Sequence, residues 1–150
     1  MLNKELDILL VEDNPSEVAL ALRAFEKNGV TNVIHHVSDG VEALDFMLDR
    51  GKYVGEGYYQ RLGLILLDIN IPKINGLEVL KVIKENPDTK SIPVIVLSSS
   101  DQPSDIYKAY SLGANSYLVK SQGFTDFVND IGTICYYWLS LNRSILSASH

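Results

Sequence analysis

Three uninterrupted apolar runs constrain the fold of this chain more than any other feature of its sequence. They are ILLV at residues 8–11, LILL at 64–67 and VIVL at 94–97. A strand with one face in water alternates apolar and polar residues, whereas a strand covered on both faces is apolar throughout. Because each run is followed by a helical pattern, the sequence predicts parallel strands between two layers of helices.

Five strand and helix units follow one another along the chain. The expected strands are Asp7–Glu12, Asn32–Val37, Leu62–Asp68, Ile92–Ser98 and Ser116–Val119. Right-handed crossovers between consecutive parallel strands predict a doubly wound α/β fold of the flavodoxin-like type. We therefore expect a five-stranded parallel sheet of order 2-1-3-4-5 with helices on both faces.

Three of the helices begin with the same local signal. Asn14, Asp39 and Asn75 each precede apolar residues at helical spacing, and each is followed three residues later by a glutamate. Such residues cap helix N-termini, and Glu17 is expected to complete a capping box with Asn14. The remaining helices are expected at about Pro103–Leu112 and from about Phe124.

The 150 residues are expected to form a single domain with a core of about 7–142 and no output domain after it. The connection Asp49–Leu62, which holds three glycines and three tyrosines, is interpreted as a surface loop or an irregular helix extension. The tail at 143–150 is expected to be frayed or to engage a partner.

Composition excludes several classes of function. A net charge of −6 argues against nucleic-acid or membrane binding driven by bulk charge. The single Cys135 cannot form an internal disulfide, which fits the cytoplasm. No segment has the length of a membrane span or the pattern of a secretory signal.

Chemically active side chains gather where the strands end. Glu12 and Asp13 end the first strand, Asp68 the third and Lys120 the fifth, while Ser98, Ser99 and Ser100 end the fourth. Ligands of such sheets bind outside the carboxyl ends of the strands. The sequence therefore predicts three carboxylates, a hydroxyl and an ammonium at one edge.

Three neighbouring carboxylates raise each other's pKa values unless a cation neutralises them. Their hard oxygen ligands favour Mg²⁺, with Mn²⁺ or Ca²⁺ as substitutes, over zinc. His35 and His36 lie within a strand, and we expect a structural role for both. Asp68 is the candidate nucleophile, because a carboxylate can form an aspartyl phosphate.

Other phosphate chemistry lacks its motif in this sequence. There is no GxxxxGK[ST] loop for a nucleotide phosphate, and Glu-Asp-Asn-Pro stands where a dinucleotide fold has its glycines. No GxSxG elbow is present either. What remains is phosphate and metal chemistry without a nucleotide cradle.

With these residues the chain resembles the receiver domain of a two-component response regulator, from about Ile8 to Leu141. The motifs that carry the resemblance are Glu12-Asp13, Asp68 in LLDINIPKINGLEVL, Ser98 in PVIVLSS and Lys120 in NSYLVK. Their spacing matches that of the family.

The resemblance implies that Asp68 accepts a phosphoryl group from a histidine kinase. It implies a metal site made by Glu12, Asp13, Asp68 and the main-chain carbonyl of Asn70. It further implies that Ser98, with Ser99 beside it, and Tyr117 form a switch, and that Lys120 pairs with the phosphate. Partner proteins would recognise the face made by the fourth helix, fifth strand and fifth helix. One of these partners would be an unidentified downstream protein.

Three departures from the family pattern stand out. Ser121 replaces the usual proline after Lys120, Ile71 replaces the usual methionine, and the connection before the third strand is long. With the aromatic last helix, these features are similar to the small single-domain regulators of cyanobacterial phytochrome kinases, which implies light signalling.

Two other functions stay open from the sequence. One is a pseudo-receiver that binds partners without phosphorylation. The other is an aspartate-nucleophile phosphatase, which Asn70 disfavours because such enzymes carry an acid at that position. We expect no enzyme activity beyond self-phosphorylation and self-dephosphorylation, and we expect homodimerisation through Tyr136 and Tyr137.

Overall fold

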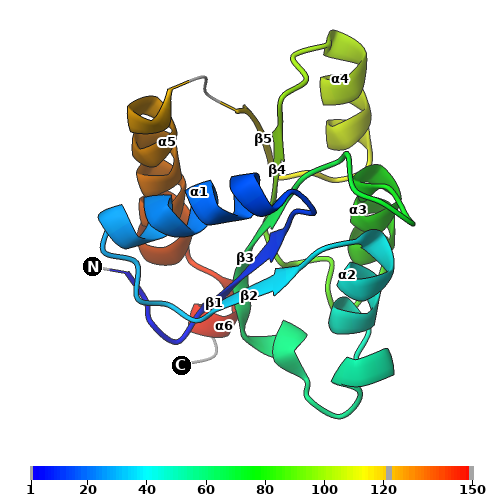
Figure 1. The fold of residues 1–150 in the computed structure, drawn as a ribbon. Helices are drawn as coiled ribbons and strands as arrows, with labels where there is room; N and C mark the ends of the chain where they lie inside the picture. The colour runs from blue at the N-terminus through cyan, green and yellow to red at the C-terminus, as the bar shows by residue number, and fades with distance from the viewer. Residues whose placement is uncertain (1, 121–122, 149–150) are drawn as a thin grey trace.

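A computed structural model describes residues 2–120 and 123–148 of the chain. Its sheet contains five parallel strands in the order β2-β1-β3-β4-β5 (Figure 1). They are β1 (Asp7–Val11), β2 (Ile34–Val37), β3 (Leu62–Leu67), β4 (Val94–Ser98) and β5 (Ser116–Val119). The predicted fold class and strand order are confirmed.

Two strands begin later than the sequence pattern indicated. The side-chain amide of Asn32 donates to the carbonyl oxygens of Asn3 and Leu6, so that Asn32 joins a loop and β2 starts at Ile34. Ile92 donates its N–H to Thr89 in a turn, and β4 starts at Val94. At the other end, β1 and β3 stop one residue before Glu12 and Asp68.

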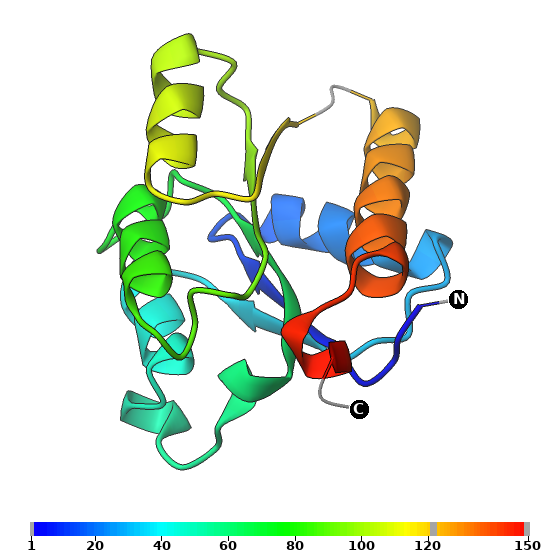
Figure 2. The same ribbon diagram turned by 180° about the vertical axis from the view of Figure 1, so that it is seen from behind.

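Helices cover both faces of the sheet (Figures 1 and 2). The helices α1 (Pro15–Lys27) and α5 (Phe124–Tyr136) lie together on one face. The other face is covered by α2 (Gly40–Met47), α3 (Gly76–Glu85) and α4 (Pro103–Ser111).

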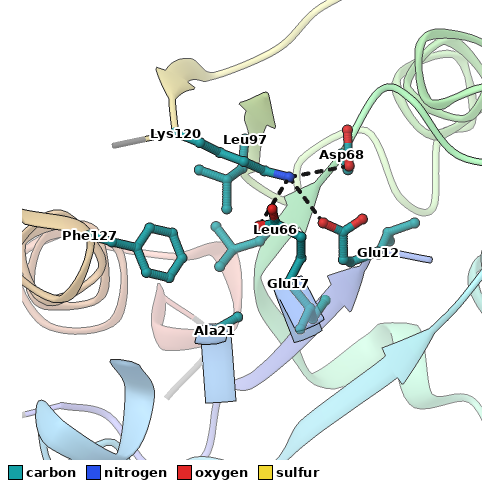
Figure 3. A pocket seen from close by; sticks show the side chains of 10 residues that line it. Glu12, Glu17, Ala21, Leu66, Asp68, Leu97, Lys120 and Phe127 are labelled. Carbon is teal, nitrogen blue, oxygen red and sulfur yellow. Dashed lines mark hydrogen bonds and ion pairs between the residues drawn. The ribbon is translucent and has the colours of Figure 1, made fainter. Parts of the chain in front are cut away.

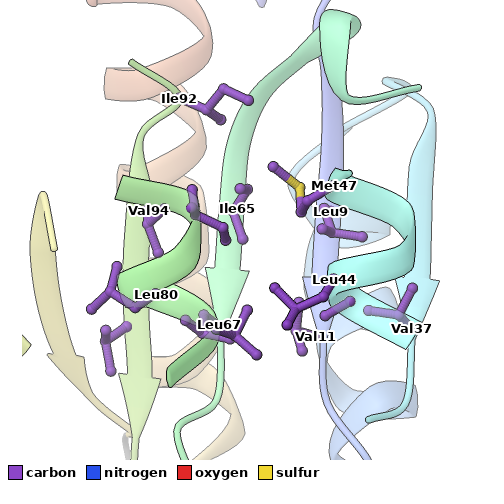
Figure 4. Close-up of a cluster of buried hydrophobic side chains, with 14 of the residues drawn as sticks. Leu9, Val11, Val37, Leu44, Met47, Ile65, Leu67, Leu80, Ile92 and Val94 are labelled. Carbon is purple, nitrogen blue, oxygen red and sulfur yellow. The ribbon is translucent and has the colours of Figure 1, made fainter. Parts of the chain in front are cut away.

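Side chains of β1 and β3 enter two separate hydrophobic cores because successive residues of a strand point to opposite faces. Leu9 and Ile65 pack with α2 and α3 (Figure 4). Ile8 and Leu64 pack with α1 and α5 instead. This double burial is the reason why the runs contain no polar residue.

The long connection before β3 contains two short 3-10 helices, η1 (Gly51–Tyr53) and η2 (Tyr58–Arg61). Tyr53 and Tyr58 both pack against Phe46 of α2, with ring centroids 5.1 and 5.6 Å away. The connection is therefore tied to the core by its aromatic residues, which goes beyond the expected surface loop.

The chain after α5 is ordered against the domain. A π-helical turn, η3 (Tyr137–Leu141), is followed by α6 (Ile145–Ala148). Ser144 is buried, and Leu146 packs on the core of α1 and α5. The expectation of a frayed tail is wrong for this segment, because the sequence pattern gave no sign that Leu146 finds an apolar surface. The other expectation, that the tail engages a partner, stays a prediction. Residues 149 and 150 lie outside the described residues.

Both strand histidines have structural partners. The Nε2 of His35 donates to Asp7 Oδ2 over 2.9 Å, and the Nε2 of His36 donates to the carbonyl oxygen of Glu12 over 2.8 Å. Within residues 2–120 and 123–148, no helix has the length and apolar character needed to cross a bilayer.

Candidate functional site

Three acidic side chains meet at the carboxyl edge of the sheet. Glu12 and Asp13 directly follow β1, and Asp68 directly follows its neighbour β3. One carboxylate oxygen from each of the three lies within 4.8 Å of the others. The structure therefore brings together the predicted carboxylates.

The backbone around Asp68 is tightly held. Its N–H donates to the carbonyl oxygen of Val11 over 3.1 Å, and its Oδ1 accepts from the N–H of Asn70 over 2.9 Å. The first residue of α3 also lies against it, since a Cβ atom on Gly76 would stand 2.4 Å from the Asp68 carbonyl oxygen. Only glycine fits at this close approach.

Lys120 supplies the positive charge of the site. Its Nζ lies 3.0 Å from Glu12 Oε1, 3.4 Å from Asp68 Oδ2 and 3.6 Å from Glu17 Oε2 (Figure 3). Its main-chain N–H donates to Ser98 over 2.8 Å, which fixes it at the end of β5 beside β4. The side chain is only 16% exposed, so water screens these ion pairs little.

Burial and charge shift the pKa values of this pair. Burial and hydrogen bonding to Asp68 raise the pKa of the Glu12 carboxyl from 4.5 to about 7, although Lys120 opposes the rise. Burial alone would lower the pKa of Lys120, but its hydrogen bond to Glu12 and the charges of Asp68, Glu12 and Glu17 raise it. The site thus holds more negative charge than one ammonium neutralises well.

The oxygen atoms of the acidic cluster fit a hard divalent cation. Mg²⁺ accepts carboxylate and carbonyl oxygens and keeps positions for water or phosphate oxygens. The raised pKa of Glu12 comes first from its burial and then from its hydrogen bond to Asp68 and the charge of that residue, and a bound cation would oppose this rise. Asn70, expected to offer its carbonyl, is exposed in the loop directly after Asp68.

Hydroxyl groups line the neighbouring strand ends. Ser98 is completely buried, and its Oγ accepts from the N–H of Ser100 over 3.1 Å. The hydroxyl of Tyr117 donates to the carbonyl oxygen of Ser100 over 2.8 Å. Ser99 is exposed and lies beside Lys120 at the opening between α1 and α5.

Two other features were not predicted correctly. Ser100 Oγ donates to Asp105 Oδ2 over 2.5 Å, which links the loop after β4 to the first turn of α4. The Glu17 carboxylate lies on Lys120 and makes no capping-box bond to the N–H of Asn14 within the described part of the chain. The contact between Glu17 and Lys120 joins residues far apart in the chain, so local sequence gave no signal for it.

Two predicted interface residues lie elsewhere. Tyr136 and Tyr137 sit at the end of α5, where they are 51% and 48% exposed and away from the acidic cluster. Ser121, which stands in place of the expected proline, lies outside the described residues.

Comparison with known proteins identifies a family. Residues 8–131 match the family described as the response regulator receiver domain. Response regulator Rcp1 from Synechocystis is 38% identical over 132 residues, which cover 88% of either chain. A probable methanogenesis regulatory protein, FilR2 from Methanothrix harundinacea, is 42% identical over 138 residues, which cover 91% of this chain and 86% of FilR2.

Solved structures agree with this match. The phosphorylated cyanobacterial phytochrome response regulator RcpA superposes with a TM-score of 0.87 at 37% identity, over 94% of this chain and 99% of RcpA. The Mn²⁺-bound form of Rcp1 superposes with a TM-score of 0.83 at 37% identity, over 93% of this chain and 98% of Rcp1.

Proposed function

The chain belongs to the family of response regulator receiver domains, and from this premise we propose that Asp68 accepts a phosphoryl group from a sensor histidine kinase. The observation that carries the proposal is the meeting of Glu12, Asp13 and Asp68 beside Lys120. An accident of surface charge would not enclose an ammonium among carboxylates that follow two separate strands.

The reaction needs one nucleophile and a way to hold charge. A carboxylate oxygen of Asp68 attacks the phosphorus atom, and an O–P bond forms as the N–P bond to the kinase histidine breaks. The imidazole nitrogen leaves with the bonding electrons and takes up a proton. Lys120 is within reach of the phosphoryl oxygens and stabilises the charge that they carry.

Glu12, Asp13, Asp68 and the main-chain carbonyl of Asn70 would hold Mg²⁺, for which Mn²⁺ or Ca²⁺ can substitute. When bound, the ion supplies positive charge to the phosphoryl oxygens. The Mn²⁺-bound form of Rcp1 supports a divalent ion in this family. Water later cleaves the same O–P bond, so the chain would perform only this chemistry on itself and would not be an enzyme for other substrates.

The signal would leave through the β4–α4 loop. A phosphoryl group on Asp68 offers strong acceptor oxygens, to which Ser98 and Ser99 can donate. Ser98 and Tyr117 both bond to Ser100, so a shift of that loop would reach the face made by α4, β5 and α5. A downstream protein would recognise this face.

The test uses the whole chain with Mg²⁺ and acetyl phosphate, followed by intact mass spectrometry. We expect one labile phosphoryl adduct that is absent from Asp68→Asn and present in Asp88→Asn, which changes an exposed acid of the α3–β4 turn. A wild-type chain without an adduct would support the pseudo-receiver. Rapid hydrolysis of many phosphate esters would support the phosphatase.

We further propose a phytochrome kinase as the sensor, because Rcp1 and RcpA are both similar to this chain over most of its length. The likeness to FilR2 makes a second kind of sensor the competing outcome. Phosphotransfer from a purified phytochrome kinase, compared in red and far-red light, tests this. Transfer that light does not change would reject the light signal.

The kinase partner is expected in the cytoplasm, and we propose the same location for this chain.

We also propose homodimerisation through the end of α5, because Tyr136, Tyr137, Leu141 and Ile145 expose 48–66% of their surface there. Sedimentation of phosphorylated and unphosphorylated protein at tens of micromolar concentration tests it, and a monomer under both conditions would reject it.

A further inference from the structure

Glu17 occupies an unusual place for a residue in the first turn of a helix. Asn14 caps α1 by accepting from the N–H groups of Ser16 and Glu17 over 2.9 and 3.3 Å. The carboxylate of Glu17 leaves this turn and lies 3.6 Å from Lys120 Nζ (Figure 3). It therefore joins α1 to the end of β5.

Two other helices with the same sequence signal show that this contact is not a property of the signal. Glu42 of α2 turns back, and its Oε1 accepts from the N–H of Ser38 over 2.8 Å. Glu78 of α3 is exposed, and its N–H donates to Asn75. Of these three glutamates, which share one position in their helices, Glu17 is the one with a described contact to Lys120.

Glu17 also differs from the other two acids on Lys120. Glu12 and Asp68 belong to the cluster that can share a cation, whereas Glu17 lies outside that cluster. When a cation and a phosphoryl group engage Glu12 and Asp68, the Glu17 carboxylate keeps its access to the ammonium. Besides the pocket that it shares with Glu12 and Asp68, Glu17 lines a second opening with Ser99, Lys120 and Phe124.

We propose that Glu17 is a positioning residue that holds Lys120 toward α1 and competes with the phosphoryl oxygens for its ammonium. This inference rests on the proposed phosphorylation of Asp68. With Glu17 present, Lys120 divides its charge between the phosphoryl group and α1. The affinity of the site for a phosphoryl group is therefore lower than Glu12, Asp68 and Lys120 alone would give.

The experiment measures the affinity of the Mg²⁺-loaded chain for beryllium fluoride, a stable stand-in for the phosphoryl group. Glu17→Gln removes the charge, and Glu17→Asp keeps the charge but is too short to reach Lys120. We expect both variants to bind beryllium fluoride about two- to five-fold more tightly than wild type, as is usual for loss of a half-exposed ion pair. The gain should shrink in high salt.

Glu78→Gln is the matched control, because it removes the same charge from the same position of α3. A role of Glu17 in helix α1 alone would leave the affinity unchanged in both Glu17 variants. A general effect of charge at the opening would raise it in Glu17→Gln and not in Glu17→Asp. Either result would overturn the proposal.

A second readout needs neither metal nor phosphoryl group. The NMR resonances of the Lys120 side chain in the metal-free protein should shift in both Glu17 variants and stay in place in Glu78→Gln. Unshifted resonances would reject the contact itself. If the resonances shift in both variants but the wild-type chain neither binds beryllium fluoride nor forms an adduct with acetyl phosphate, the contact stands and the phosphorylation of Asp68 is rejected instead.

Discussion

The two ends of β1 place a buried carboxylate in two different settings. Asp7, at the amino end, is 2% exposed and accepts from His35, with Arg61 Nε at 3.7 Å. Glu12, at the carboxyl end, is 4% exposed and shares Lys120 with two other acids. Equal burial therefore does not decide what a carboxylate does.

The surroundings make the difference. The ring of His35 packs against the rings of both Phe46 and Tyr58, with centroid distances of 5.1 and 5.0 Å, so the partner of Asp7 is fixed in place. Around Glu12 the acids outnumber the cation, and another cation can be accommodated. The comparison teaches that a buried carboxylate with one fixed hydrogen-bond partner is part of the fold, whereas a surplus of like charge makes a site.

The largest expected effect is at the carboxyl end. Asp68→Asn should remove the phosphoryl adduct completely, because the amide is no nucleophile. It should change the free energy of unfolding of the metal-free protein by less than about 1 kcal/mol, since Lys120 keeps Glu12 and Glu17. Urea denaturation beside intact mass measures both, and a strongly destabilised variant would contradict the comparison.

At the amino end the pattern should reverse. Asp7→Ala leaves His35 without its carboxylate and is expected to cost about 2–4 kcal/mol of unfolding free energy. The adduct at Asp68 should still form with acetyl phosphate at a temperature where the variant is folded. Asp88→Ala, at an exposed acid, serves as the control for urea denaturation.

The third prediction concerns pH. Because the folded chain raises the pKa of Glu12 from 4.5 to about 7, it keeps a proton there that the unfolded chain loses earlier. The resulting stability is fully present below pH 4.5 and is lost as the pH rises through 7. We expect the metal-free protein to lose roughly 3 kcal/mol across this window through this group.

The pH profile of unfolding measures this loss. Glu12→Gln, which cannot ionise, should flatten the profile, and Mg²⁺ should restore the stability of wild type above pH 7 because it replaces the lost proton. A wild-type profile that matches that of Glu12→Gln would reject the assignment of the loss to Glu12.

The smallest effect is expected for Tyr58, whose ring packs on His35, the partner of Asp7 at the amino end of β1. Tyr58→Leu removes the ring contacts with His35 and Phe46 and should cost about 1 kcal/mol. Phosphorylation should be unchanged. Tyr59→Leu, in the same 3-10 helix and without a described ring contact, is the matched control for thermal unfolding.

Sequence alone was sufficient for the strand order and for the acids of the site. Apolar runs and the residues that follow them are local, and the parallel topology then brings the strand ends together. Asp13, Asp68 and Lys120 follow from that rule.

Side-chain contacts between distant elements were beyond local pattern. Glu17 reads as a capping residue in its own turn, and only the end of β5, more than a hundred residues later, redirects it. In the same way, the packing of Tyr58 on His35 joins two segments, and neither sequence alone indicates the contact. The sequence pattern thus predicts the course of the backbone better than it predicts which charged or aromatic side chains contact each other.

The close fit of Gly76 against Asp68 has a mechanical consequence. On that side of the phosphoacceptor, backbone touches backbone, and Gly76 N–H donates to the carbonyl oxygen of Ile69 over 2.9 Å. On the other side, the contacts are hydrogen bonds of serine side chains, in which Ser98 Oγ accepts from the N–H of Ser100 and Ser100 Oγ donates to Asp105. A displacement that starts at Asp68 therefore meets packed backbone on the side of α3 and side-chain hydrogen bonds on the side of α4.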